Sequence, residues 1–207
     1  MESLYNGDGF VIARATALEE IEESVTLFEA VSAEMGWSPG DRLRAYAANA
    51  EYLMALVGGA LAGAVQIVLS NGHDPMPSDH VWPELAAGRR YDLAHASVMA
   101  LAPRFRGAAG LFGPLGVEMW RLCRDAGKSE IWIECVPRNL AVYRRCGWPL
   151  EVAGELRTHF GEPCYLARMG VEAVAESLRA RAGRCDGFAR LVAQAYRDTG
   201  WRSMGLA

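Results

Sequence analysis

Apolar side chains recur along this chain at two different spacings, and these spacings separate the expected helices from the expected strands. From Leu18 to Met35 they recur at steps of three and four residues, which gives a helix one apolar face. Residues 111–126 show a second long helical pattern, and a glycine directly follows each of the two segments. We expect Thr16 to be the N-cap of the first helix, with Glu19 as its capping-box partner.

Seven apolar runs have the composition and length of strands, and they lie at residues 10–13, 51–57, 62–69, 91–101, 130–136, 151–157 and 163–169. Gly58-Gly59 suits a tight hairpin turn between the second and third runs. Short helices are expected at residues 81–87 and 137–146, and residues 41–48 are expected to form a helix or an ordered loop. Antiparallel strands followed by strand–helix–strand units predict an α/β (α+β) fold: a mixed, mostly antiparallel central sheet flanked by helices on both faces.

The pattern changes at Val171, where two amphipathic helices are expected at residues 171–182 and 185–198, joined by Gly183. We therefore expect a domain over residues 1–170 and a C-terminal helical extension over residues 171–207. The extension could cap the domain or pair with a second copy of the chain, which would give a homodimer.

A turn after the expected strand at residues 91–101 is the most informative segment, and it reads A-P-R-F-R-G-A-A-G over residues 102–110. A strand that enters a turn of small residues and then a helix builds an anion site, because N–H groups at the helix start are free to bind phosphate oxygens. Arg104 and Arg106 add fixed positive charge. The sequence thus predicts a phosphate-bearing ligand at the carboxyl end of this strand, contacted also by Gly107, Ala108, Ala109 and Gly110.

Composition narrows the class of protein. The chain has 207 residues, 51% of them hydrophobic, and a net charge of −4, which favours a globular domain and argues against nucleic-acid binding. Its five cysteines form no C-x-x-C pair, and the histidines lack a metal-ligand spacing, so we expect buried free thiols and no metal site. Neither a signal peptide nor a membrane span is visible, and we expect a cytoplasmic protein.

Two segments, in the right order, resemble motifs of the GNAT superfamily of acyl-CoA-dependent N-acyltransferases. The P-R-F-R-G at residues 103–107 resembles the pyrophosphate-binding motif P-x-Y-R-G-x-G-x-G. The Y-R-R-C-G-W at residues 143–148 resembles the later motif Y-x-x-x-G-F. The resemblance implies a GNAT-like sheet and an activity that transfers an acyl group to an amine.

A narrower resemblance is to the branch of acyl-homoserine-lactone (autoinducer) synthases and long-chain N-acyl amino acid synthases. It rests on V-P-R at residues 136–138 and on Phe28 with M-G-W at residues 35–37, which is similar to that branch's F-x-x-E-x-G-W opening. Autoinducer synthases carry an arginine where this chain has Ser24, and E-x-S-R-F where residues 95–99 read H-A-S-V-M. An N-acylated amine or amino acid is therefore favoured over a lactone as the product, with a medium or long acyl chain.

For the donor, the resemblance implies acyl-CoA or an acyl carrier protein as co-substrate, and no metal. Backbone N–H groups from Met99 to Leu101 would hold the donor and polarise its thioester carbonyl, and Tyr143 would protonate the leaving thiolate. The acyl group would pass directly to a small amine or amino acid. Two alternatives are an acyl-CoA-binding regulatory module without turnover and an autoinducer synthase proper.

For the acceptor, Glu134, His95 and Asp92 are the candidates for the base that removes the amine proton, unless water relays it. Asp92 is also a candidate contact for the acceptor. Three tryptophans are candidates for lining an acyl or acceptor tunnel: Trp37, Trp82 and Trp148.

Overall fold

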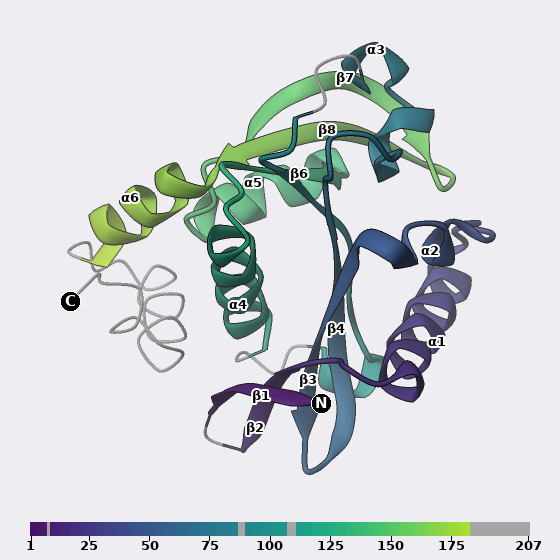
Figure 1. Ribbon diagram of the computed structural model, residues 1–207, viewed down its shortest axis with the longest axis vertical. Helices are drawn as coiled ribbons and strands as arrows, with labels where there is room; N and C mark the ends of the chain where they lie inside the picture. The colour runs from purple at the N-terminus through teal and green to yellow at the C-terminus, as the bar shows by residue number, and fades with distance from the viewer. Residues whose placement is uncertain (8, 87–89, 107–110, 183–207) are drawn as a thin grey trace.

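One eight-stranded sheet forms the centre of the molecule, with the strand order β1-β2-β3-β4-β5-β6-β8-β7 (Figure 1). The computed structural model describes residues 1–7, 9–86, 90–106 and 111–182. All neighbouring strands are antiparallel except β5 and β6, which are parallel. The strands are β1 (Glu2–Asn6), β2 (Phe10–Arg14), β3 (Ala50–Val57), β4 (Ala60–Leu69), β5 (Leu93–Leu101), β6 (Glu130–Cys135), β7 (Glu151–His159) and β8 (Glu162–Gly170).

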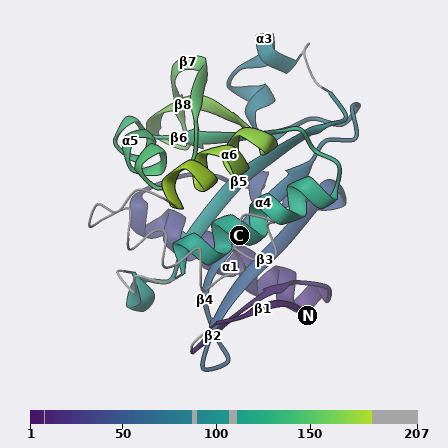
Figure 2. The same ribbon diagram turned by 90° about the vertical axis from the view of Figure 1, so that its left-hand side faces the viewer.

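Helices cover both faces of this sheet (Figures 1 and 2). Helix α1 (Leu18–Met35) buries Val25 and Phe28 against one face, and α2 (Arg42–Ala45) lies beside α1. Helices α4 (Phe112–Asp125), α5 (Pro137–Arg145) and α6 (Val171–Ala182) pack on the other face. A short helix, α3 (Pro83–Ala86), and three 3-10 turns at Ala47–Asn49, Pro77–His80 and Pro103–Phe105 complete the described elements. The predicted fold class and all seven predicted strands are confirmed.

Local sequence explains the main boundaries. Gly58 and Gly59 adopt φ values of 57° and 81°, which only glycine tolerates easily in succession, and they close the β3–β4 hairpin. Gly36, with φ 71°, ends α1 through the expected left-handed cap.

The start of α1 corrects one expectation. The N-cap is Ala17 rather than Thr16, and the carboxylate that accepts the free amides of residues 16 and 17 belongs to Glu20 rather than Glu19. Thr16 instead accepts a hydrogen bond from the amino group of Met1, which also pairs with Glu20. The first strand, β1, was not predicted, because its five residues carry little apolar patterning and it pairs only with β2 at the edge of the sheet.

Helix α6 belongs to the main core. Its buried side chains Val174 and Leu178 join the cluster that α4 makes with the sheet, and Val171 accepts a hydrogen bond from the indole of Trp120 on α4. The second expected C-terminal helix, at residues 185–198, lies outside the described residues, so the predicted extension as a whole stays a prediction. Within the described part of the chain, no helix is long and apolar enough to cross a membrane.

A split in the sheet positions the site. Strand β5 pairs with β6 only over residues 93–96, opposite residues 130–133, whereas its pairing with β4 continues to Leu101. A shift of register against β4 leaves Ser97 as an extra residue and marks the point where β5 turns away from β6. The outer halves of these two parallel strands therefore separate and leave a gap that side chains line from both faces.

Candidate active site

A cavity of about 190 Å³ lies at the split between β5 and β6. Its walls come from segments far apart in the chain: the end of α1, the outer half of β5, the start of α4, the end of β6, α5 and the β7–β8 turn. Its lining residues include Trp37, Met99, Phe112, Glu134, Cys135, Asn139, Tyr143, Trp148, His159 and Phe160.

The alternation of β6 divides this cavity between the two faces of the sheet. Ile133 and Cys135 point to the face covered by α4 and α5, where they join the main core. Glu134 points to the opposite face, toward His95 of β5 and His159 at the end of β7. The cavity thus has a polar part around Glu134 and an aromatic part around Tyr143, joined through the split.

Glu134 lies between two imidazoles. Its Oε2 is 2.8 Å from Nε2 of His95, and its Oε1 is 3.7 Å from Nδ1 of His159. The three side chains are 7%, 0% and 4% exposed, respectively. The first distance is that of a hydrogen bond, but the angles are poor, and no polar atom of the three side chains has a well-formed hydrogen bond among the described residues.

The charges in this cluster follow from burial and proximity. Burial acts to raise the pKa of Glu134, but the neighbouring imidazoles of His95 and His159 outweigh it and hold that pKa below its usual value. Burial lowers the pKa of His159 to about 4, although Glu134 opposes the shift. At neutral pH the cluster therefore holds a carboxylate next to an uncharged His159.

Glu134 and His159 line the cavity, whereas His95 lies behind Glu134. Two of the three bases suggested by the sequence, Glu134 and His95, are thus in contact with each other, and of these two only Glu134 lines the cavity. His95 is better placed to orient the carboxylate.

Tyr143 stands on α5 in the aromatic part of the cavity. Its ring stacks on Phe112 at 5.6 Å between ring centres and contacts Trp148 at 5.6 Å. Trp148 also stacks on Phe112, at 5.5 Å, and packs so closely on α4 that a Cβ at Gly116 would lie 2.5 Å from its ring. Burial raises the Tyr143 pKa to about 12, and a hydrogen bond with the side chain of Asn139 acts to lower that pKa. Its hydroxyl is therefore a protonated donor at neutral pH.

The outer half of β5 has backbone groups that do not pair with β4. The Ala102 amide donates to Ala62 of β4, so the alternation of an antiparallel pair directs the amides of residues 98 and 100 to β4 as well. The backbone groups of Met99 and Leu101 then face the side that β6 has left. The carbonyl of Leu101 accepts a hydrogen bond from Arg106, and Met99 lines the cavity.

Of the predicted phosphate turn, the structure describes residues 102–106 and 111 onward, and Gly107, Ala108, Ala109 and Gly110 lie outside the described residues. Arg106 makes a two-bond ion pair with Glu34 of α1, at 2.5 and 2.8 Å. Arg104 is exposed and stacks over the ring of Phe105, 4.7 Å from its centre. Arg106 is therefore partly neutralised, which the sequence did not foresee because Glu34 lies far from it in the chain.

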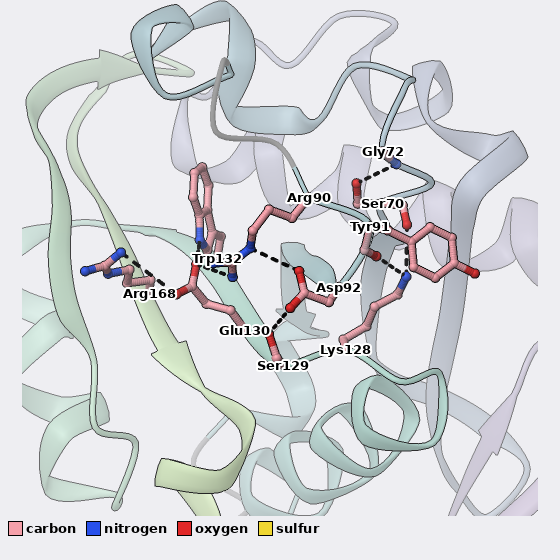
Figure 3. Close-up of polar contacts among 10 residues, drawn as sticks. All are labelled: Ser70, Gly72, Arg90, Tyr91, Asp92, Lys128, Ser129, Glu130, Trp132 and Arg168. Atoms are coloured by element: carbon pink, nitrogen blue, oxygen red, sulfur yellow. Dashed lines mark hydrogen bonds and ion pairs between the residues drawn. The ribbon is translucent and has the colours of Figure 1, made fainter.

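Two predicted contacts lie away from the cavity. Trp82 is fully buried, packs with Leu166 of β8 and donates its indole N–H to the Glu155 carbonyl, so the structure gives it a place in the core. Asp92 lies near the opposite end of β5, where it accepts a hydrogen bond from Ser129 and pairs with Arg90 (Figure 3). In contrast, Trp37 and Trp148 both line the cavity, and the Trp37 indole N–H has no hydrogen-bond partner among the described residues.

Sequence reasoning missed His159 and Phe112. His159 lies beside the β7–β8 turn and its role as a neighbour of Glu134 depends on the pairing of three strands, which no local pattern reveals. Among the described residues, no group of three histidines, cysteines or carboxylates is placed to hold a metal ion. Burial raises the Cys135 pKa to about 11, which disfavours a thiolate nucleophile.

Comparison with known proteins places the fold. No family model matches the sequence, and no curated protein is similar to it in sequence. Among solved structures, FeeM, an N-acyl amino acid synthase from uncultured soil microbes, superposes with a TM-score of 0.71 at 18% identity, over 81% of this chain and 93% of that one.

The CoA-dependent acyl-homoserine lactone synthase BjaI superposes with a TM-score of 0.66 at 19% identity, over 91% of this chain and 100% of the other. The acyl-homoserine lactone synthase LasI superposes with a TM-score of 0.62 at 16% identity, over 82% of this chain and 91% of LasI. A putative acetyltransferase of the GNAT family superposes with a TM-score of 0.54 at 14% identity, over 78% of this chain and 99% of the other. The chain therefore has the GNAT acyltransferase fold, with the N-acyl amino acid and acyl-homoserine lactone synthases among its structural neighbours.

Proposed function

We propose that this protein is an N-acyltransferase that moves an acyl group from acyl-CoA or an acyl carrier protein to a small amine or amino acid. One observation carries the proposal: the cavity in the sheet split joins a buried carboxylate on one face to a protonated tyrosine on the other. Amine acyl transfer needs a proton acceptor near the amine and a proton donor near the leaving thiolate, each within hydrogen-bond reach of the proton that it moves.

In this mechanism the pantetheine arm lies in the split, with the thioester carbonyl against the backbone amide of Met99. Glu134 takes a proton from the acceptor ammonium, and the free amine attacks the carbonyl carbon. As the tetrahedral intermediate collapses, the C–S bond breaks and Tyr143 gives its proton to the sulfur, while the attacking nitrogen loses its second proton, which restores the Tyr143 hydroxyl. Thioester and ammonium thus become amide, thiol and one released proton.

The aromatic part of the cavity supports a medium or long acyl chain. Phe112, Tyr143 and Trp148 line it and stack on one another, and an apolar chain gains about 0.8 kcal/mol for each CH₂ group that it buries against such a wall. The structural likeness to FeeM and BjaI, at 18% and 19% identity, bears on the fold alone.

A donor and acceptor panel tests the proposal. The purified protein would be incubated with acyl-CoAs and acyl carrier proteins of increasing chain length and with free amino acids and simple amines, and released thiol would be measured. We expect thiol release that depends on both partners and is faster with longer chains than with acetyl. Absence of release from every donor, together with absence of donor binding, would overturn the proposal.

A further inference from the structure

His159 takes no part in the two proton transfers of the proposed mechanism. It lines the cavity beside Glu134, and both of its ring nitrogens lack a hydrogen-bond partner among the described residues. We propose that His159 and Glu134 together bind the amino group of the acceptor, so that His159 accepts one N–H bond while Glu134 accepts the proton to be removed. This inference rests on the proposed function and assigns a binding residue to its acceptor.

The spacing of the two acceptor atoms fits one nitrogen. Glu134 Oε1 and His159 Nδ1 are 3.7 Å apart, which is too long for a hydrogen bond between them. A nitrogen placed about 2.9 Å from each would make two hydrogen bonds at an angle of roughly 80°, which an ammonium group can meet with modest bending. Loss of a proton to Glu134 leaves the lone pair directed at that carboxylate, so the free amine then turns about its C–N bond and directs the lone pair at the split.

Surrounding rings hold the His159 ring in place. The rings of Phe160 and His80 contact His159 edge-on, with 3.9 and 5.2 Å between ring centres. The Trp82 ring lies tilted against it at 6.2 Å. Phe160 has φ 51°, the one positive value at a non-glycine residue among those described. A bulky residue in this region is strained. This angle belongs to the two-residue turn between β7 and β8, and the turn fixes the end of β7, where His159 lies.

The charges around His159 keep it a hydrogen-bond acceptor. The guanidinium of Arg42 lies 5.6 Å from the centre of the Phe160 ring and donates a hydrogen bond to Nε2 of the exposed His80. Its positive charge therefore lies beyond the two rings that contact His159. Burial, His80, His95 and Arg42 all lower the His159 pKa, and only Glu134 raises it. An uncharged imidazole offers a lone pair to an ammonium, whereas an imidazolium would repel it.

The inference predicts which kinetic constant changes. In His159→Leu the acceptor loses one hydrogen bond made by a charged donor, and we expect its KM to rise by about ten- to hundredfold. The KM of the acyl donor should stay within about twofold, because the donor lies in the split rather than on this face. His159→Gln supplies an amide oxygen in place of the ring nitrogen and should restore most of the acceptor affinity.

The experiment uses the full chain and the best acceptor found in the thiol-release panel. His73→Gln, in an exposed loop, controls for the loss of a histidine as such, and thermal unfolding of each variant controls for folding. An unchanged acceptor KM in His159→Leu would overturn the inference, as would a rise confined to the donor KM. Either result would leave the proposed function standing, because wild-type turnover is measured separately.

A second measurement needs neither turnover nor a folded Leu variant. Nitrogen-15 resonances of the imidazoles would be followed while ethylammonium chloride is added to the wild-type protein. We expect the His159 ring nitrogens to shift and those of His73 to stay. Shifts absent at His159, at concentrations that saturate any other site, would contradict an amine-binding role whatever the activity panel shows.

Discussion

Oε2 of Glu134 lies 2.8 Å from Nε2 of His95, and both side chains are buried next to the split in the sheet. Because parallel β5 and β6 pair at His95 and separate just beyond it, the carboxylate is both supported by an imidazole and open to the cavity. A buried carboxylate that contacts both an imidazole and a cavity marks a candidate functional site.

Removing the charge of Glu134 should slow the chemical step. Glutamine has nearly the same shape as glutamate, but its amide cannot accept the ammonium proton. We therefore expect kcat of Glu134→Gln to fall by about 10²- to 10³-fold. Glu130→Gln is the matched control, because Glu130 lies on the same strand and the same face but pairs with Arg90 and Arg168 outside the cavity. Equal rates in the two variants would argue that water or another group is the base.

Tyr143→Phe should separate the hydroxyl from the ring. Phenylalanine keeps the stack on Phe112 and Trp148, so donor and acceptor KM should change little, while kcat falls by about ten- to hundredfold. Because the Tyr143 pKa is raised to about 12, the wild-type rate should show no loss from tyrosine ionisation between pH 7 and 10. A pH–rate profile of both proteins checks the two statements, and a variant with wild-type kcat would remove Tyr143 from the mechanism.

The Arg106–Glu34 pair should set donor affinity. If Arg106 contacts the pyrophosphate of CoA, Arg106→Gln should raise the acyl-CoA KM by about tenfold, and the rise should shrink at high salt. Glu34→Gln leaves the arginine unneutralised and should lower that KM or leave it unchanged. A higher KM in both variants would instead mean that the pair acts as a structural link between α1 and the turn.

Acid should destabilise the fold through His159. Its pKa is about 4 in the folded protein and about 6.5 in the unfolded chain, so the unfolded state binds more protons between these values. Stability is therefore fully present above pH 6.5 and is lost as pH falls toward 4, by up to about 3 kcal/mol. Urea unfolding at several pH values should show a smaller loss in His159→Gln than in the wild type, and parallel curves would contradict the assignment.

Lys128, the only lysine of the chain, should matter for stability rather than for catalysis. Its buried ammonium donates to the carbonyls of Ser70 and Tyr91 at 2.9 and 2.7 Å and lies 4.2 Å from the centre of the Tyr91 ring (Figure 3). Lys128→Met leaves both carbonyls without this donor and should cost about 2–3 kcal/mol of unfolding free energy. We expect kcat at 25 °C to stay near the wild-type value, and a large fall in kcat with unchanged stability would contradict this view.

Sequence patterns predicted the sheet, the two long helices and the strand–turn–helix segment, because these depend on local periodicity and on glycines at turns. They also singled out Glu134 and Tyr143, which the structure places along one cavity. Local patterns could not show that His95 lies behind Glu134, since that depends on the register of two strands. Nor could they show Trp82 in the core or the pairing of Arg106 with Glu34, because both involve partners distant in the chain.

His159 illustrates the limit most clearly. In the sequence it stands among polar residues next to a turn, which is typical of a solvated histidine. In the fold, β8 pairs with β6 on one side and with β7 on the other, and this carries the end of β7 over Glu134. Burial and charge then give the histidine its properties, and neither can be read from its neighbours in the chain.

The most direct measurement is the product itself. The wild-type protein would be mixed with one long-chain acyl-CoA and its preferred amine, and amide and free thiol would be quantified together by mass spectrometry. We predict equal amounts of both, formed at a rate that falls by about 10²-fold or more in Glu134→Gln and is kept in Glu130→Gln. Thiol without amide, or amide formed equally well by Glu134→Gln, would contradict the claim that the carboxylate in the sheet split drives acyl transfer to an amine.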